Sequence, residues 1–286
     1  MGALRVLTAV VVSVVLGAGQ FALAAEPCRV TRSELDGREQ VVMENDYVSL
    51  TFTPSQGGRC TRFLYKPTGA LWAGDAAGTH LLGDRIWEQQ GGGGDWIGAP
   101  YKLAVLKHTP QEVSVELFGQ GKTGALEFCG FRKRVTLTRD SSAVRVHYAY
   151  EVRQEAMAPQ TAGLWFNSEV SLPKQKITCY RPVAEGVKTV LYDPLAPPPD
   201  YLDYEPTRGW LGLVGAGGSG LGVRMEYPRL MCLYQWFGDQ VLTLEWMLRN
   251  VTIANNSQLE TDVVFLPFHG LDKVSGLGDD GTDGQG

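Results

Sequence analysis

A glutamate inside an apolar, aromatic segment near the C-terminus is the side chain of this sequence best suited to chemistry. Glu245 lies in the run LTLEW (242–246). Because successive residues of a strand point to opposite faces, a strand here separates Glu245 from Leu244 and Trp246. A carboxylate held by a rigid strand beside aromatic side chains suits sugar binding or proton transfer. A solvated glutamate on an outer sheet face is the alternative, which the strand pattern leaves open.

Aromatic residues next to polar ones are the second chemical signal. Carbohydrate sites place aromatic rings against the apolar faces of sugars and surround the hydroxyls with polar groups. Trp87 and Trp96 stand beside charged residues or glycines, so we expect both to contact a ligand, whereas Trp210 and Trp246 fit the core better. Arg85 is able to make bidentate contacts with an acidic sugar or to bridge a neighbouring carboxylate.

Four histidines are the candidate proton donors. His80 lies in the run THLLGDR (79–85), close to Arg85, and we expect it to be the acid that partners Glu245. A loop histidine that caps a neighbouring carbonyl is the alternative. His147 and His269 lie within or at the end of predicted strands and are weaker candidates.

The charge and the cysteines exclude several classes of function. The net charge is −5 and the sequence has no basic patch, which excludes nucleic acid as a partner. The five cysteines form no CxxC or Cys/His cluster, so we expect no metal, and no motif indicates a cofactor. One or two disulfides are compatible with the spacing, and Cys28 and Cys60 are the pair nearest in sequence.

The N-terminus has the pattern of a signal peptide over residues 1–25. Arg5 supplies the positive charge, residues 6–16 are nearly all apolar, and Ala22 to Ala24 form a small-x-small cleavage site. The apolar run is too short for a comfortable membrane span. We therefore expect a secreted or periplasmic protein with no span after signal removal; a retained N-terminal anchor is the alternative.

Strand-type segments predominate between Gln40 and His269. They are short, rich in β-branched and aromatic residues, and separated by Gly, Pro, Asn or Asp at intervals of about 8–12 residues. No segment has sustained helical periodicity. The pattern predicts an all-β protein, a large antiparallel β-sandwich forming a single domain over 26–270. The Gly- and Asp-rich tail over 271–286 is expected to be disordered.

Several of these segments together resemble the galactose mutarotase-like family. The matching runs are Glu44 to Leu50 followed by Gly57-Gly58-Arg59, Gly83-Asp84-Arg85-Ile86, Trp165-Phe166-Asn167, Leu233-Tyr234-Gln235-Trp236 and Leu244-Glu245-Trp246. Asp84 replaces the Asn of the family's Asn-Arg-Ile segment. The resemblance spans roughly Val41 to Phe268 and implies a β-supersandwich fold with a sugar in its cleft.

In the family's epimerases a Glu accepts the proton and a His protonates the ring oxygen. The resemblance implies that Glu245 is the base and that Arg85 binds the substrate, with Asn167, Tyr234 and Trp236 as further substrate-binding residues. The histidine does not carry over, because Ala162-Gly163-Leu164 stands where it should precede the Trp-Phe-Asn run. The second histidine is also missing.

Three hypotheses follow. The first is an exported carbohydrate-active protein with Glu245 as general base, in epimerisation at the anomeric carbon or in lyase-type proton abstraction next to a uronate carboxyl. The second is a non-catalytic carbohydrate-binding or scaffolding protein that kept the cleft and lost the acid. Under both, the partner is a mono- or oligosaccharide, neutral or acidic. The third is an extracellular interaction module with no sugar function.

Overall fold

The structure is a computed structural model made almost entirely of β-strands. It describes residues 28–74, 78–88, 96, 98–121, 124–156, 158–171, 175–204, 206–238, 241–278 and 282–285. The predicted signal peptide therefore lies outside the described residues. Among the described residues, helix is limited to Trp96 and to short 3-10 turns at Gly124–Phe128, Ala216–Gly218 and Tyr227–Arg229. No helix in these ranges is long and apolar enough to cross a membrane.

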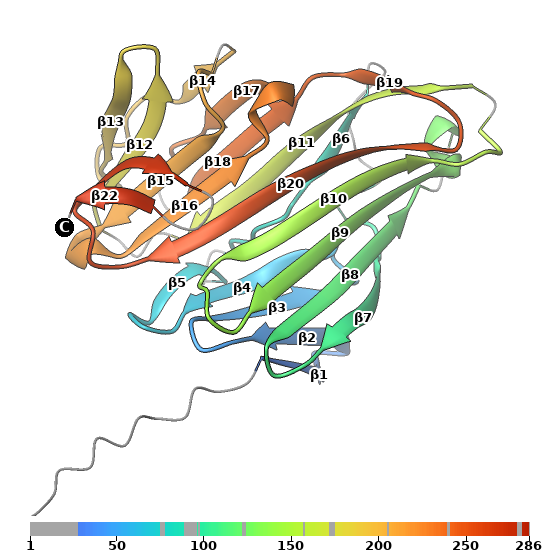
Figure 1. Cartoon of the computed structure of the whole chain (residues 1–286), viewed down its shortest axis with the longest axis horizontal. Helices are drawn as coiled ribbons and strands as arrows, with labels where there is room; N and C mark the ends of the chain where they lie inside the picture. The colour runs from blue at the N-terminus through green and yellow to red at the C-terminus, as the bar shows by residue number, and fades with distance from the viewer. Residues whose placement is uncertain are drawn as a thin grey trace, which may run out of the picture.

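The largest layer is a nine-stranded antiparallel sheet with the order β13-β12-β15-β16-β20-β10-β9-β8-β7. Its strands are β7 (Lys102–His108), β8 (Glu112–Gln120), β9 (Cys129–Thr138), β10 (Val144–Val152), β12 (Ile177–Val183), β13 (Gly186–Tyr192), β15 (Trp210–Gly215), β16 (Gly220–Met225) and β20 (Ser257–Phe268). Figure 1 shows β20, β10, β9, β8 and β7 running side by side across the molecule.

A six-stranded antiparallel sheet forms the second layer, with the order β14-β17-β18-β11-β19. Its strands are β6 (Arg85–Glu88), β11 (Gln160–Ser171), β14 (Tyr201–Asp203), β17 (Leu230–Gln235), β18 (Val241–Leu248) and β19 (Val251–Ile253). β18 and β19 follow one another along one edge of β11, where β19 pairs with residues 160–162, and β6 pairs with residues 162–165 on the opposite edge.

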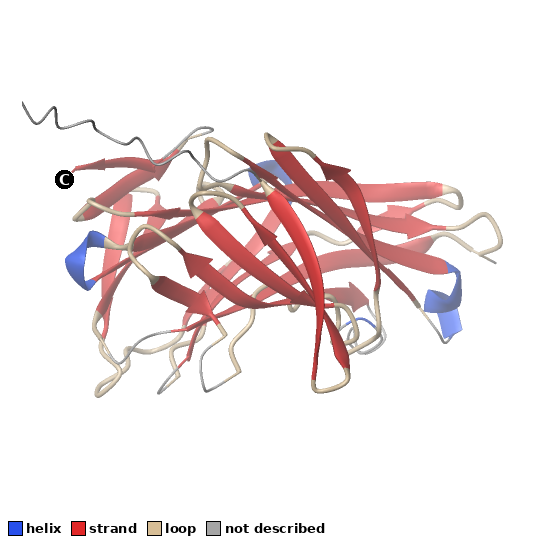
Figure 2. Cartoon of the chain, turned by 90° about the horizontal axis from the view of Figure 1, so that it is seen from below, coloured by secondary structure: helices blue, strands red, loops and turns tan. Residues whose placement is uncertain are grey.

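The N-terminal strands form a five-stranded sheet in sequence order, shown in blue and cyan in Figure 1. They are β1 (Arg29–Leu35), β2 (Arg38–Glu44), β3 (Val48–Thr53), β4 (Arg59–Tyr65) and β5 (Ala70–Ala73). Figure 2 shows that strands make up most of the described chain and that the short helical turns lie near the edges of the molecule.

The C-terminal tail is not disordered over its strand segments, so that prediction is wrong there. β21 (Lys273–Leu277) pairs with β22 (Thr282–Gln285). Val274 is completely buried and belongs to a small core cluster with Tyr180 and Trp210. Burial of Val274 against β12 and β15, with Leu271 and Leu277 packed on the same cluster, favours order in a segment that is otherwise rich in Gly and Asp.

The two large sheets pack face to face through aromatic side chains. Phe166 of β11 stacks on Trp246 of β18 with ring centroids 5.2 Å apart, and Trp246 meets Phe265 of β20 at 6.2 Å. Tyr148 of β10 packs edge-on against Phe166 at 4.6 Å. These contacts confirm the predicted antiparallel sandwich, and they confirm Trp246 as a core residue.

Candidate functional site

The face of the six-stranded sheet that points away from this core carries most of the predicted site residues. Tyr234, Glu245 and Asn167 lie directly opposite one another on β17, β18 and β11. Their neighbours in sequence, such as Trp246 and Phe166, point into the core, so these three residues share the outer face. One register position therefore brings together three residues that are far apart in the chain.

Glu245 is joined to Arg85 through a single indole. The Nε1–H of Trp165 donates a hydrogen bond to Oε2 of Glu245 at 2.7 Å. The guanidinium carbon of Arg85, on the neighbouring strand β6, lies over the same Trp165 ring, 4.8 Å from its centroid. Glu245 is only 3% exposed, so the alternative of a solvated glutamate is wrong. Arg85 and Glu245 thus lie on the same side of the molecule.

Tyr234 is held by an aspartate beside the edge strand. Its hydroxyl donates to Oδ2 of Asp200 at 3.0 Å, while the main-chain N–H of Phe237 donates to Oδ1 of the same carboxylate at 3.1 Å. Burial, followed by the charges of Asp200 and Glu245, raises the pKa of Tyr234 to about 12. The hydroxyl therefore stays protonated at neutral pH and acts as a hydrogen-bond donor.

A parallel row of residues lies two positions along the same strands. Glu169 of β11 is opposite Thr243 of β18. Trp236 follows β17 and exchanges two hydrogen bonds with Thr243, one from its own N–H to Oγ1 at 2.9 Å and one to its carbonyl at 3.0 Å. Trp236 is 45% exposed. The exposed Trp236 therefore lies on the same outer face as Glu169, with β18 between them.

His80 belongs to this second row and not to that of Glu245. The N–H of Glu169 donates to the carbonyl of His80 at 2.8 Å, and that of Gly83 donates to the carbonyl of Asn167 at 2.9 Å, so the chain from His80 to Gly83 runs beside β11. Nδ1 of His80 lies 3.2 Å from Oε2 of Glu169. The hydrogen bond from His80, with the charges of Arg59 and Arg85, holds the pKa of Glu169 below its usual range.

A polar hollow of about 570 Å³ opens beside His80. It is lined in part by Ser55, Gln56, Arg59, Thr61, Thr79 and His80. Arg59 is half-buried, and burial lowers its pKa. Nε of Arg59 and Nε of Arg85 are both buried without a hydrogen-bond partner among the described residues. Because Arg59 lines the hollow, this end of the site offers a cationic side chain to a ligand.

A completely buried ion pair fixes the segments that carry the two arginines. Nζ of Lys133 lies 3.2 Å from Oδ2 of Asp84, and neither side chain is more than 1% exposed. Nζ also donates to the carbonyls of Leu82 at 2.6 Å and Gly57 at 3.2 Å. Burial raises the pKa of Asp84 and lowers that of Lys133. Lys133 of β9 thus ties together the two chain segments that precede Arg85 and Arg59.

No family model and no curated protein matches the sequence. Solved structures do match. A galactose mutarotase-like protein from Clostridium acetobutylicum aligns with a TM-score of 0.64 at 8% identity over 85% of this chain and 99% of that one. A protein provisionally assigned as an aldose 1-epimerase, from Klebsiella pneumoniae, aligns with a TM-score of 0.62 at 11% identity over 84% and 83%. This chain has the galactose mutarotase-like fold.

The same fold also occurs as part of longer proteins. A TPR-domain containing protein from Parabacteroides distasonis aligns with a TM-score of 0.57 at 11% identity, over 87% of this chain but 55% of that one. At these identities the likeness establishes the galactose mutarotase-like fold, and function has to be argued from the site itself.

The absence of a histidine before Trp165 has a steric reason in this version of the fold. Gly163 shares the outer face with Trp165, and its main chain packs closely on the carbonyl of Leu248 and the side chain of Asn250. A Cβ at Gly163 would lie 2.8 Å from the Leu248 carbonyl oxygen and closer still to the Asn250 side chain. Any side chain at position 163 therefore requires β18 and Asn250 to move.

Of the two tryptophans predicted to contact a ligand outside the family resemblance, one lies in the core and the other stays a prediction. Trp96 is completely buried and packs edge-on against Phe131 and Tyr150 at centroid distances of 6.0 and 6.3 Å. The prediction of a sugar contact by Trp96 is therefore wrong, because its ring lies in the core. Trp87 pairs through its main chain with Gly163 on β11, and its side chain lies outside the part of the chain that the structure describes.

The cysteines and the metal-binding side chains give no further site. Cys28 and Cys60 are both buried and free, so the suggested disulfide between them is not formed. In the described ranges, no group of three His, Cys, Asp or Glu residues is placed to hold a metal ion.

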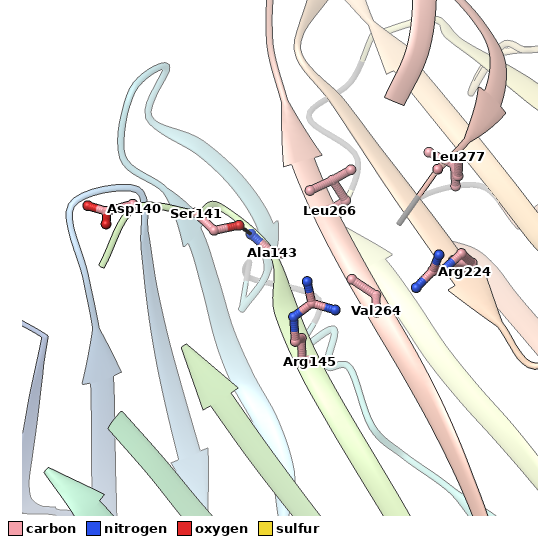
Figure 3. Close-up of a pocket in the computed structure, with 9 residues that line it drawn as sticks. Asp140, Ser141, Ala143, Arg145, Arg224, Val264, Leu266 and Leu277 are labelled. Carbon is pink, nitrogen blue, oxygen red and sulfur yellow. Dashed lines mark hydrogen bonds between the residues drawn. The ribbon is translucent and has the colours of Figure 1, made fainter. Parts of the chain in front are cut away.

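A second hollow, of about 250 Å³, lies on the outer face of the nine-stranded sheet. Arg145 of β10 and Arg224 of β16 are both opposite Val264 of β20, one on each side, and Leu277 of β21 covers part of the hollow (Figure 3). None of the predicted site residues lines it among the described positions. It is therefore a separate surface, useful as a control.

Proposed function

We propose that this chain binds a carbohydrate on the outer face of the six-stranded sheet, with Arg85 and Glu245 as its charged recognition groups. The observation that carries the proposal is the Trp165 indole, which holds the Glu245 carboxylate at its N–H and the Arg85 guanidinium over its ring. A fixed acceptor and a fixed donor beside an aromatic side chain are what sugar hydroxyls require. The fold of the sugar-related neighbours supports the same proposal.

A glycan array followed by calorimetry tests this proposal. Neutral and acidic oligosaccharides are screened, and the best ligand is titrated into the unmodified protein, Arg85→Gln and Arg145→Gln. Loss of a charged hydrogen bond should weaken binding by Arg85→Gln about tenfold or more. Arg145→Gln, the same change in the hollow on the other sheet, should bind normally. Equal weakening by both variants, or no ligand in the screen, contradicts the proposal.

Catalysis is the second candidate, and the position of Tyr234 favours it. Tyr234 is opposite Glu245 on the neighbouring strand, and its hydroxyl stays protonated at neutral pH. In an epimerisation, Glu245 takes the proton of the anomeric hydroxyl, while the Tyr234 hydroxyl turns away from Asp200 and donates its proton to the ring oxygen. The bond between the ring oxygen and the anomeric carbon breaks, and the free aldehyde closes again from either face. His80 lies on the row of Glu169, whereas Tyr234 lies on the row of Glu245, which makes Tyr234 the better placed donor.

Glu245→Gln separates the two candidates. The rate of anomeric exchange is followed by NMR with the unmodified protein and with this variant, beside Glu127→Gln, an exposed glutamate of the Gly124–Phe128 turn. For a catalyst, the acceleration disappears in Glu245→Gln while sugar affinity remains. For a binding protein, no acceleration is seen with any variant, and affinity falls in Glu245→Gln.

We also propose that residues 1–25 act as an export signal, on the sequence pattern alone. Mass spectrometry of protein recovered from outside the cytoplasm should give a chain that starts after Ala25. A recovered chain that still begins at Met1 contradicts export by cleavage.

A further inference from the structure

Exposed apolar side chains gather at one edge of the proposed sugar-binding face. Leu202 of β14 is 47% exposed, Tyr204 is 66% exposed and Trp236 is 45% exposed. Leu202 lies directly opposite Tyr234, which places it on the same register row as Glu245. A group of large exposed apolar side chains next to polar groups indicates a binding surface, whereas a single exposed apolar residue does not.

Trp236 in this cluster is held rigidly. Its main chain is hydrogen-bonded to Thr243 on both sides, and the next residue, Phe237, is buried and donates its N–H to Asp200. The same Asp200 carboxylate fixes the hydroxyl of Tyr234. The ring itself packs on Gly238, where an added Cβ would lie 2.8 Å from a Trp236 ring carbon, so the indole loses little freedom when a sugar stacks on it.

The face is much wider than one sugar. From β14 through β17, β18 and β11 to β6 there are four strand spacings, or about 19 Å at the usual ~4.8 Å each. A pyranose ring is about as wide as one such spacing. A monosaccharide beside Glu245 therefore leaves the Trp236 edge empty on one side and the hollow at Arg59 and His80 empty on the other.

We infer that the ligand is an oligosaccharide that crosses the strands, with one unit beside Glu245 and further units stacked on Trp236. This inference rests on the proposed function and adds the ligand's length and direction. The two ends of the face differ in chemistry: Arg59 and Arg85 place their guanidinium groups at the β6 side, and Leu202 and Trp236 expose apolar surface at the β14 side. Added units at the aromatic end should therefore gain affinity through ring stacking and not through charge.

Oligosaccharide ladders test the inference. Glucan, xylan and polygalacturonate oligomers of one to about six units, a range that passes the roughly four units that fit across the face, are titrated into the unmodified protein, Trp236→Ala and Tyr227→Ala. Tyr227 is a matched control, because it is also aromatic and 47% exposed but lies in the Tyr227–Arg229 turn. Thermal unfolding of each variant checks that the fold is retained, and Trp236→Phe should keep part of the affinity.

The expected result is a rise in affinity of about tenfold between the monomer and the longer oligomers of one ladder. Trp236→Ala should abolish that rise, so that it binds the longer oligomers no more tightly than the monomer, while Tyr227→Ala should keep the full rise. Equal affinity for monomer and oligomers overturns the inference and leaves the proposed function standing. Equal loss in both variants also overturns it. Failure of every ladder to bind overturns the inference and the proposed function together.

Discussion

Replacement of Lys133 by Met should destabilise the protein severely, because it leaves Asp84 as a buried charge without a partner. Nζ of Lys133 is 3.2 Å from Oδ2 of Asp84, and both side chains are at most 1% exposed. Removal of one partner of such a pair costs about 3–5 kcal/mol. The variant also leaves the carbonyls of Leu82 and Gly57 without the ammonium donor. The expected loss lies at the upper end of this range.

Thermal unfolding followed by circular dichroism measures this loss. For a chain of this size, about 3–5 kcal/mol corresponds to a fall in Tm of roughly 6–20 °C. Lys107→Met is the matched control, because Lys107 pairs with Glu112 at 2.9 Å but its side chain is 50% exposed. An exposed pair of that kind contributes less than about 1 kcal/mol.

A double variant checks the physical reason for the loss. Lys133→Met combined with Asp84→Asn removes both buried charges, so it should be more stable than Lys133→Met alone. A fall in Tm for Lys133→Met no larger than that for Lys107→Met would refute the reasoning. A Tm of the double variant well below that of Lys133→Met alone would refute it too.

Two further results are expected from the titratable groups. The pKa of Glu169 is lowered chiefly by the hydrogen bond from His80, so its stabilisation is present above the unfolded pKa and is lost as the pH falls through the folded value. In Glu169→Gln, the free energy of unfolding should therefore fall less steeply as the pH drops below about 4.3. Glu185→Gln, at an exposed turn, should keep the slope of the unmodified protein. The same slope for both variants would contradict this. Burial raises the pKa of Cys60 and Cys179 to about 12, so a thiol reagent should leave the native protein unmodified and label all five cysteines in denaturant. Fewer than five labelled thiols would indicate a disulfide.

The architecture and the outer-face residues could be predicted from strand alternation. Alternation alone separates Glu245 from Trp246, and the structure follows it. The same alternation places Trp165 on the face of Asn167, two residues away. Trp165 is not among the predicted site residues, although this alternation is a signal in the sequence that could have identified it as the partner of Glu245.

Other parts of the site depend on packing between distant segments, which no local pattern reveals. The pairing of His80 with Glu169 arises because the chain before β6 runs beside β11. Lys133 looks in sequence like a solvated strand lysine, yet it is completely buried. Trp96 follows a glycine run, which suggested an exposed loop, but its ring fills the core between Phe131 and Tyr150.

The position of a bound sugar tests the central claim most directly. A crystal structure of the protein with the oligosaccharide selected by the array should show sugar oxygens within about 3.2 Å of the Arg85 guanidinium or the Glu245 carboxylate. Sugar bound in the hollow between Arg145 and Arg224, with the outer face of the six-stranded sheet empty, would contradict the account.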